Sequence, residues 1–259
     1  MLTVRNAADQ RYYRAESLAD GRLAARPLSA APWEAGQVQD DSRAMTLAEL
    51  TAPLLPSKII GIGQNYFHGP EKRGRGRPER PLLFLKPPSS LLPSGEQLVI
   101  PPFCERVEYE VELGVVIGRR ARHVRRADAM DYVFGYTVLC DVTARDLQPL
   151  DKQWTRAKGC DGFCPIGPAI VDAQRLDPNN LRLQLWQNGE LRQDGSTSEM
   201  LFKVDELIEF VSAAMTLWPG DVLSTGTPTS GSQLHVGDQL RMRVQGIPEL
   251  SFTVGACVG

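Results

Sequence analysis

The sequence predicts a mixed, β-rich α+β fold with few helices. Three observations indicate it: many short runs of apolar or β-branched residues, one stretch with helical spacing of its apolar residues, and an Asn188-Gly189 turn between two of the short runs. The chain has 259 residues, of which 42% are hydrophobic and 23% charged, so it is long enough to bury a full core. One helix among many strands argues against a doubly wound nucleotide-binding fold.

The composition also narrows the partners and the compartment. A formal net charge of -2 argues against a general nucleic-acid binder, which needs an excess of Lys and Arg to displace counterions from phosphates. No apolar run near the N-terminus could serve as the core of a signal peptide, and no stretch approaches membrane-spanning length. We therefore expect a cytoplasmic protein that binds neither nucleic acid nor membranes. Its five cysteines form no Cys-x-x-Cys pair, which favours reduced thiols.

Prolines divide the chain near residue 56. Residues 1–56 mix short apolar runs with several prolines, and we interpret them as a small N-terminal β-subdomain that precedes a larger unit at 57–259. The larger unit begins with short buried strands predicted at 59–62 and 82–85. The loop between them, at 71–81, is rich in Gly, Arg and Pro. Its basic residues could cover a site or attract an anionic substrate, but solvation is the commoner role of such a run.

Residues 107–117 carry the clearest pattern in the sequence. Apolar side chains alternate with Glu108, Glu110 and Glu112, a period of two that predicts a β-strand with three carboxylates on one face. Farther along the chain, a β-branched and aromatic run predicts a strand that ends just before Asp141.

The remaining elements follow from turn signals and periodicity. The Asn188-Gly189 dipeptide favours a tight turn and joins two strands into a hairpin. Apolar residues at helical spacing predict an amphipathic helix at 205–217, which Pro219-Gly220 ends. The other predicted elements are a short helix at 127–132 and strands at 133–140, 181–187, 190–193, 222–225, 239–244 and 250–254.

The carboxylates indicate a metal site. Like charges on one strand face repel one another and are costly to bury unless a cation neutralises them. A site built from carboxylates suits a hard cation such as Mg²⁺ or Mn²⁺, which keeps positions open for substrate oxygens. A charged outer strand face in water explains the same alternation, and the pattern alone does not exclude it.

Several motifs then follow one another in a fixed order. They are EYEVELGVVIG at 108–118, GYTVLCD at 135–141, TARDLQ at 143–148, KGCDGFCPIGP at 158–168, NGELR at 188–192, PGD at 219–221 and TGTP at 225–228. Each motif is weak by itself, but in this order they resemble the core of the fumarylacetoacetate hydrolase family over residues 57–254. The resemblance implies a catalytic domain at 57–259 with the β-sandwich or β-roll of that family, usually in a homodimer.

The resemblance also assigns roles to the acidic residues and to one lysine. It implies that Glu110, Glu112 and Asp141 hold the metal ion, which leaves Glu108 outside the ligand set. Lys158, which would count as a surface lysine without the family match, would lie near the developing enolate of the substrate.

Further residues would contact the substrate or activate water. The resemblance implies that Arg145, Gln148 and Thr227 bind the substrate carboxylate. Hydrolytic members use a His and a Glu three residues later to activate water. His68 and Glu71 keep this spacing, although His68 lies one residue closer to the preceding tyrosine than is usual in the family. The nearby Gly61-x-Gly63 lacks the third glycine of a dinucleotide-binding loop, so we reject that interpretation.

We therefore expect a Mg²⁺-dependent isomerase or decarboxylase that acts on a small 2-oxo or 2-hydroxy-enoic diacid. The hairpin and residues 129–133 resemble the branch that acts on 2-hydroxyhepta-2,4-diene-1,7-dioate and on 5-carboxymethyl-2-oxo-hex-3-ene-1,7-dioate in aromatic catabolism. Oxaloacetate decarboxylation is one alternative, and hydrolysis of an acylpyruvate or fumarylpyruvate, which needs a working His68–Glu71 pair, is another. A metal-dependent carboxylate-binding subunit without turnover is the alternative from a different functional class.

Overall fold

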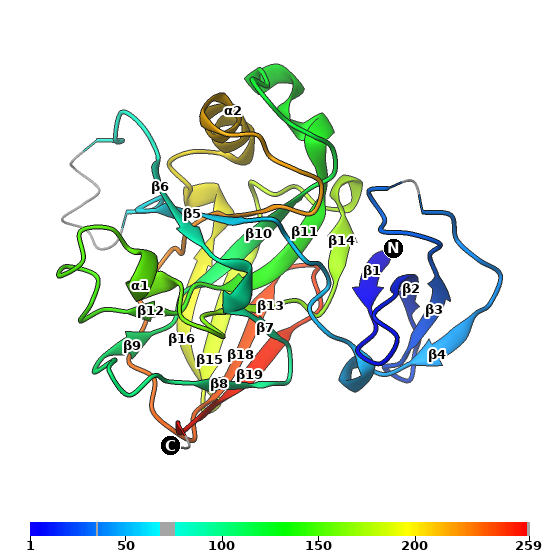
Figure 1. Ribbon diagram of the computed structural model, residues 1–259, viewed down its shortest axis with the longest axis horizontal. Coiled ribbons are helices and arrows are strands. Elements are labelled where there is room, and N and C mark those ends of the chain that lie inside the picture. The colour runs from blue at the N-terminus through cyan, green and yellow to red at the C-terminus, as the bar shows by residue number, and fades with distance from the viewer. Residues whose placement is uncertain (35, 68–75, 258–259) are drawn as a thin grey trace.

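The structure is a computed structural model that describes residues 1–34, 36–67 and 76–257. Its strands form a large mixed sheet, a five-stranded sheet that packs against it, and a two-stranded ribbon (Figure 1). This arrangement confirms the predicted β-rich fold class.

The large sheet has 12 strands, most of which follow one path. In order across the sheet, this path runs through β4 (Arg43–Met45), β3 (Leu23–Pro27), β2 (Tyr12–Ser17), β1 (Leu2–Arg5), β14 (Ile170–Asp172), β11 (Val133–Cys140), β10 (Val111–Ile117), β17 (Val222–Ser224), β5 (Ile59–Gly63) and β6 (Leu82–Lys86). Off this path, β13 (Cys164–Ile166) pairs with β11 and with β7 (Leu91–Pro93). The sheet is mixed because β17 runs parallel to β5, and β13 to β7, among antiparallel neighbours.

The other elements are smaller. The second sheet has the order β16 (Glu190–Ser196), β15 (Arg182–Gln187), β18 (Gln239–Val244), β19 (Leu250–Gly255) and β8 (Gln97–Val99), and the ribbon pairs β12 (Thr143–Ala144) with β9 (Val107–Glu108). The α-helices are α1 (Thr155–Lys158) and α2 (Val204–Ala214). Short 3₁₀ helices cover Leu47–Glu49, Pro88–Ser90, Arg126–Tyr132, Ala173–Arg175 and Thr197–Glu199.

Strand β10 lies in the middle of the large sheet and is buried on both faces. Val111, Leu113 and Val115 belong to the main core, where β10 packs against β15 and β18. Val116 belongs to a second apolar cluster on the opposite face. Since side chains alternate along a strand, Glu112 shares the face of Val116 and points away from the main core.

The single strand predicted at 107–117 is two strands in the structure. β9 ends at Glu108 and pairs with β12, whereas β10 begins after Glu110 and pairs with β11, so the chain changes partners at this point. The backbone N–H of Asp141, which lies between β11 and β12, donates to the carbonyl of Glu110 at 2.9 Å and joins the two pairings. The acidic side chains still line one pocket, as the alternation predicted.

Two further predictions need correction. The strand predicted at 82–85 exists as β6, but it is not buried: Leu82 and Leu85 are 43% and 48% exposed because β6 is an edge strand with β5 as its neighbour on the strand path. The helix predicted at 205–217 ends at Ala214, where Met215 turns to an extended conformation, so Pro219-Gly220 does not end it.

Most other predicted elements are confirmed. The hairpin turns at Asn188 and Gly189 with φ of 54° and 83°, the positive angles that favour this dipeptide. The strands predicted at 59–62, 133–140, 222–225, 239–244 and 250–254 correspond to β5, β11, β17, β18 and β19.

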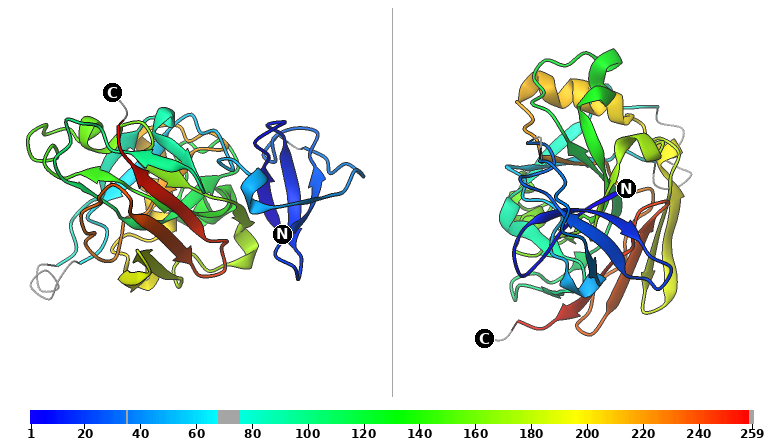
Figure 2. Two further views of the ribbon diagram at one scale, coloured as in Figure 1. Left: turned by 90° about the horizontal axis from the view of Figure 1, so that it is seen from below. Right: turned by 90° about the vertical axis from the view of Figure 1, so that its right-hand side faces the viewer.

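Strands β1 to β4 fall within the first 56 residues and form a lobe beside the rest of the molecule (Figure 2). They continue the large sheet, because β1 pairs with β14 and Arg14 donates two hydrogen bonds to Asp172, at 2.8 and 2.6 Å. The division into two units at residue 56 stays a prediction. Among the described residues, no helix combines the length and apolar character needed to cross a membrane.

Asp221 joins the parallel strands β5 and β17. Its buried carboxylate accepts hydrogen bonds from the backbone N–H groups of Ser57, Lys58 and Trp218 at 3.0, 3.1 and 2.7 Å, and from the Ser57 hydroxyl at 2.6 Å. It also pairs with the Lys58 ammonium. The start of β5 is thereby fixed to the turn before β17.

We predict that Asp221→Ala lowers the free energy of unfolding by about 3 kcal/mol, since it leaves buried N–H groups and a lysine without their partner. Urea denaturation followed by circular dichroism measures the change. Asp20→Ala is the matched control, because Asp20 forms an exposed pair with Arg22, and its loss should leave the midpoint unchanged. Equal midpoints for the two variants would contradict this role of Asp221.

Candidate active site

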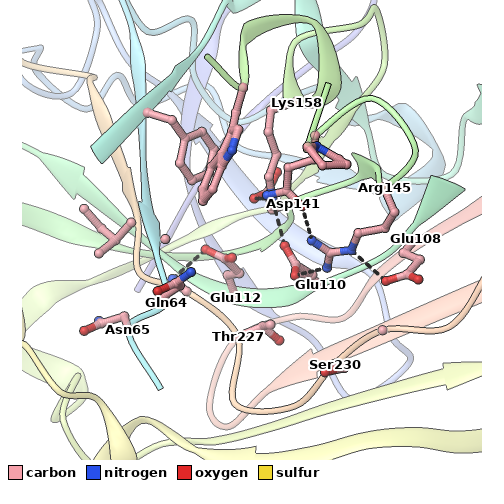
Figure 3. A pocket seen from close by; sticks show the side chains of 18 of the residues that line it. Gln64, Asn65, Glu108, Glu110, Glu112, Asp141, Arg145, Lys158, Thr227 and Ser230 are labelled. Carbon is pink, nitrogen blue, oxygen red and sulfur yellow. Dashed lines mark hydrogen bonds and ion pairs between the residues drawn. The ribbon is translucent and has the colours of Figure 1, made fainter. Parts of the chain in front are cut away.

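Three carboxylates meet where the central strands end. Glu110 precedes β10, Glu112 lies within it, and Asp141 follows β11 (Figure 3). One carboxylate oxygen of each lies within 4.8 Å of the others. Glu112 and Asp141 are buried, and so is Glu108, so the interpretation of a charged strand face in water is wrong.

The surroundings of the two glutamates differ. The Glu112 carboxylate accepts hydrogen bonds from the Ser224 hydroxyl at 2.5 Å and the Gly226 N–H at 2.7 Å. Burial, with the negative charges of Asp141 and Glu110, raises the pKa of Glu112 to about 8.

The pKa of Glu110 shifts in the opposite direction. Burial alone would raise its pKa, but the positive charges and hydrogen bonds of Lys158 and Arg145 outweigh burial and lower the pKa to about 2.

Two buried lysines share Asp141. The Lys158 ammonium donates to Asp141 and, at 2.9 Å, to Glu110. The Lys86 ammonium donates to the other oxygen of Asp141 at 2.7 Å and to the backbone carbonyl of Lys158. Burial alone would lower the pKa of Lys158, but Asp141 and Glu110 raise it, so its ammonium stays charged.

Lys158 is thus not the surface lysine that the sequence without the family match would suggest. Lys86 was missed by the sequence-based interpretation. A lysine at the end of an apolar strand, directly before Pro87 and Pro88, was the available signal.

The residues of the cluster fit a divalent cation. Three carboxylate oxygens are the donor set of a hard metal ion such as Mg²⁺ or Mn²⁺. Among the described residues, Glu112 forms no ion pair with a Lys or Arg, and burial together with the charges of Asp141 and Glu110 disfavours its ionised form. A cation between the three carboxylates would supply compensating charge, so Glu110, Glu112 and Asp141 are the residues that could hold it.

Arg145 connects this cluster to the mouth of the pocket. Its guanidinium donates to Glu108 at 2.7 Å, to the side-chain oxygen of Gln148 at 3.0 Å, and to Glu110. Burial would lower the pKa of Arg145, but the carboxylates of Glu110 and Glu108 raise it. Glu108 lies outside the acidic cluster, and Arg106 forms its second ion pair.

The pocket has a volume of about 640 Å³, and aromatic rings form one wall. The Phe84 and Trp154 rings lie 5.5 Å apart, and the Lys158 ammonium lies 4.9 Å from the Phe84 ring. Gly61 and Gly63 make room for these rings: an added Cβ would lie 2.1 Å from Phe84 and 2.8 Å from Trp154, respectively. The two glycines therefore serve packing, which agrees with the rejection of a dinucleotide-binding loop.

The structure brings together most of the predicted site residues. Thr227 lines the pocket, where its hydroxyl accepts a hydrogen bond from Gln193 at 3.3 Å. Arg145, Gln148 and Lys158 line it as well. The roles proposed for these residues toward a substrate stay predictions.

His68 and Glu71 lie outside the described residues, and so do Lys72, Arg73 and Arg75 of the basic loop. Arg77, at the described end of that loop, pairs with Glu206 at 2.7 Å and lies 4.1 Å from the Phe202 ring. Its guanidinium is therefore held against the protein rather than only solvated.

A family model and several known proteins match most of this chain. The family model for the fumarylacetoacetate (FAA) hydrolase C-terminal domain matches residues 58–255. A mitochondrial oxaloacetate tautomerase of Arabidopsis thaliana is 43% identical over 202 residues, which cover 76% of this chain and 91% of that protein.

Solved structures match over nearly the whole chain. A 5-carboxymethyl-2-hydroxymuconate delta-isomerase from Mycobacterium smegmatis has a TM-score of 0.89 at 36% identity, with 99% of this chain and 100% of that chain covered. A 2-hydroxyhepta-2,4-diene-1,7-dioate isomerase from Mycobacterium marinum has a TM-score of 0.89 at 36% identity, with 100% of both chains covered.

We predict that Asp141→Asn weakens Mg²⁺ binding at least about 10-fold, because one charged ligand is lost while its shape is retained. Isothermal titration calorimetry with Mg²⁺ measures the affinity, and circular dichroism checks that the fold persists. Glu108→Gln is the matched control, since Glu108 lies outside the acidic cluster, and its affinity should stay near that of the wild type. A larger loss in Glu108→Gln than in Asp141→Asn would mean that the ligand set is wrongly assigned.

Proposed function

The chain belongs to the fumarylacetoacetate hydrolase family, and we propose that it is a Mg²⁺-dependent enzyme that interconverts the keto and enol forms of a small 2-oxo dicarboxylate. Members of this family are enzymes that typically bind a divalent metal. The observation that carries the proposal is the buried Lys158 ammonium, held at the acidic cluster and open to the same pocket.

The names of the relatives support this reaction type. One is a tautomerase of oxaloacetate, and two are isomerases of unsaturated diacids. Tautomerases and keto–enol isomerases move a proton within the substrate, and neither adds water. The shared need is a site that stabilises negative charge on an oxygen while a neighbouring carbon loses its proton.

Two groups at the acidic cluster would supply positive charge: a bound divalent cation and the ammonium of Lys158. A divalent cation, when bound by Glu110, Glu112 and Asp141, supplies the charge that makes a 2-oxo group a better electron acceptor. Lys158 adds a fixed ammonium, which is protonated because its carboxylate partners raise its pKa. Because Lys158 is buried, its charge stabilises developing negative charge more than it would at the surface.

The substrate carboxylate would lie toward Arg145. The guanidinium is planar and carries several donors, a geometry that suits a carboxylate. Gln148 holds one of its nitrogens, and Glu108 another, so the group is fixed before a ligand arrives. Thr227, which also lines the pocket, would add a hydroxyl.

The assembly is a second part of the proposal. We expect a homodimer, as the family resemblance implies. The edge strand β6 supports this, because among the described strands it pairs with β5, and Leu82 and Leu85 are exposed on it.

A substrate panel with Mg²⁺ tests the reaction type. It contains oxaloacetate, 2-hydroxyhepta-2,4-diene-1,7-dioate and an acylpyruvate, and NMR in D₂O follows exchange at the carbon next to the carbonyl together with product formation. Exchange without cleavage supports keto–enol isomerisation. Loss of CO₂ or cleavage of the acylpyruvate would instead assign decarboxylation or hydrolysis, and no reaction at all would favour a carboxylate-binding subunit.

We predict that Lys158→Met lowers turnover by about 10²-fold or more, while the affinity for pyruvate changes far less. The reason is that the ammonium meets charge that is larger in the transition state than in the ground state. Steady-state kinetics and calorimetric titration with pyruvate separate the two effects. Lys152→Met, at an exposed lysine outside the pocket, is the control, and wild-type turnover in Lys158→Met would contradict the assigned role.

We also predict that His68→Ala changes the rate of deuterium exchange into the substrate by less than about 3-fold, because isomerisation needs no base that activates water. A hydrolase would lose about 10²-fold in product formation in the same variant. Following both processes in one NMR sample makes the comparison internal. A large loss of exchange together with product would show that His68 takes part in proton transfer itself.

A further inference from the structure

Arg106 lies at the open end of the pocket and has no role in the proposed reaction. The exposed fraction of the side chains rises along the pocket, from 1% at Asp141 through 12% at Glu110 and 22% at Arg145 to 64% at Arg106. The acidic cluster is thus the closed end, and Arg106 marks the mouth.

The backbone of Arg106 is fixed while its side chain keeps donors to spare. Its carbonyl accepts from the N–H of Arg145 at 2.7 Å, and its own N–H donates to Asp146 at 3.3 Å. Among the described residues, Glu108 forms an ion pair with the Arg106 guanidinium through one carboxylate oxygen. Its second oxygen binds Arg145. A guanidinium has five N–H donors, so one ion pair leaves several available to a ligand.

The charges of the pocket favour a ligand with two negative charges. Among the described residues, four carboxylates and four cationic side chains line or contact the pocket: Glu108, Glu110, Glu112 and Asp141 against Lys86, Arg106, Arg145 and Lys158. These charges cancel when all are ionised. A divalent cation at the acidic cluster would leave two positive charges, which a dicarboxylate balances and a monocarboxylate does not.

We propose that Arg106 binds the carboxylate at the far end of the substrate and thereby selects dicarboxylates over monocarboxylates of the same chain length. The inference rests on the proposed function for the placement of the 2-oxo end at the acidic cluster. The substrate then extends past Arg145 toward the mouth, where Arg106 is the next cationic group that the described part of the chain offers. Arg106 is a specificity residue and takes no part in the proton transfer.

A purely structural role for Arg106 makes a different prediction. If the residue only neutralised Glu108, its removal would disturb Arg145 through the shared carboxylate. The affinity for every ligand that uses Arg145 would then fall by a similar factor, whether or not the ligand has a second carboxylate.

Two ligands of equal carbon number separate these roles. 2-Oxoglutarate carries a terminal carboxylate where 2-oxopentanoate carries a methyl group. Calorimetric titration of the intact protein with each ligand in the presence of Mg²⁺ gives the affinities. The variants are Arg106→Gln, Arg106→Lys, and the control Arg120→Gln, whose exposed guanidinium lies 5.4 Å from the Trp218 ring and outside the pocket.

We predict that the wild type prefers 2-oxoglutarate and that Arg106→Gln lowers its affinity about 10-fold or more, the usual effect of losing a hydrogen bond to a charged group. The affinity for 2-oxopentanoate should change less than about 2-fold, Arg106→Lys should retain part of the preference, and Arg120→Gln all of it.

Equal losses for both ligands in Arg106→Gln, or a wild type without preference, would overturn the inference. Its failure is distinguishable from that of the proposed function: a protein that prefers 2-oxoglutarate but catalyses no exchange on the substrate panel keeps the role of Arg106 and loses the reaction.

Discussion

The structure depends on the neutralisation of carboxylates buried at the end of the central strands. Asp141 leaves β11 in the middle of the large sheet, where an unpaired charge would be costly. Lys86 reaches it from the end of β6, and Lys158 from the end of α1, so three segments distant in the sequence meet at one side chain. The same contacts that make burial of the acid tolerable also place two ammonium groups beside a candidate metal site. Stability and chemistry therefore draw on one set of ion pairs.

The sequence could predict some parts of this arrangement and not others. The alternation along 107–117 placed the carboxylates on one face, because a period of two survives the exchange of strand partners at Glu110. The exchange itself was not predictable, since it depends on a backbone hydrogen bond from Asp141, which is distant in the sequence. Lys86 was missed for a similar reason: its place at the end of an apolar strand, before two prolines, does not show that a buried carboxylate of another strand lies opposite it.

Local patterns also fail where burial depends on neighbours. The apolar run of β6 predicted a buried strand, yet its position at the edge of the sheet leaves Leu82 and Leu85 exposed. Helix α1, with four residues, is too short for a periodic signal, although it delivers Lys158. By contrast, the Asn188-Gly189 hairpin was predictable in detail because its turn requires positive φ angles that few residues adopt. Features set by short-range constraints could thus be predicted from the sequence. The long-range contacts that complete the site could be predicted only through the family resemblance.

The ion pair between Asp141 and Lys158 joins residues 17 positions apart in the chain, so the segment between them forms a closed loop. Arg145 and Gln148 lie inside this loop, and Arg106, directly before β9, accepts a hydrogen bond from the Arg145 N–H through its carbonyl. Changes in the length or composition of the loop would therefore alter the lining of the pocket, while both ends stay anchored in the core. A graft of this segment between relatives would have to keep Arg145, because its guanidinium binds both Glu110 and Glu108.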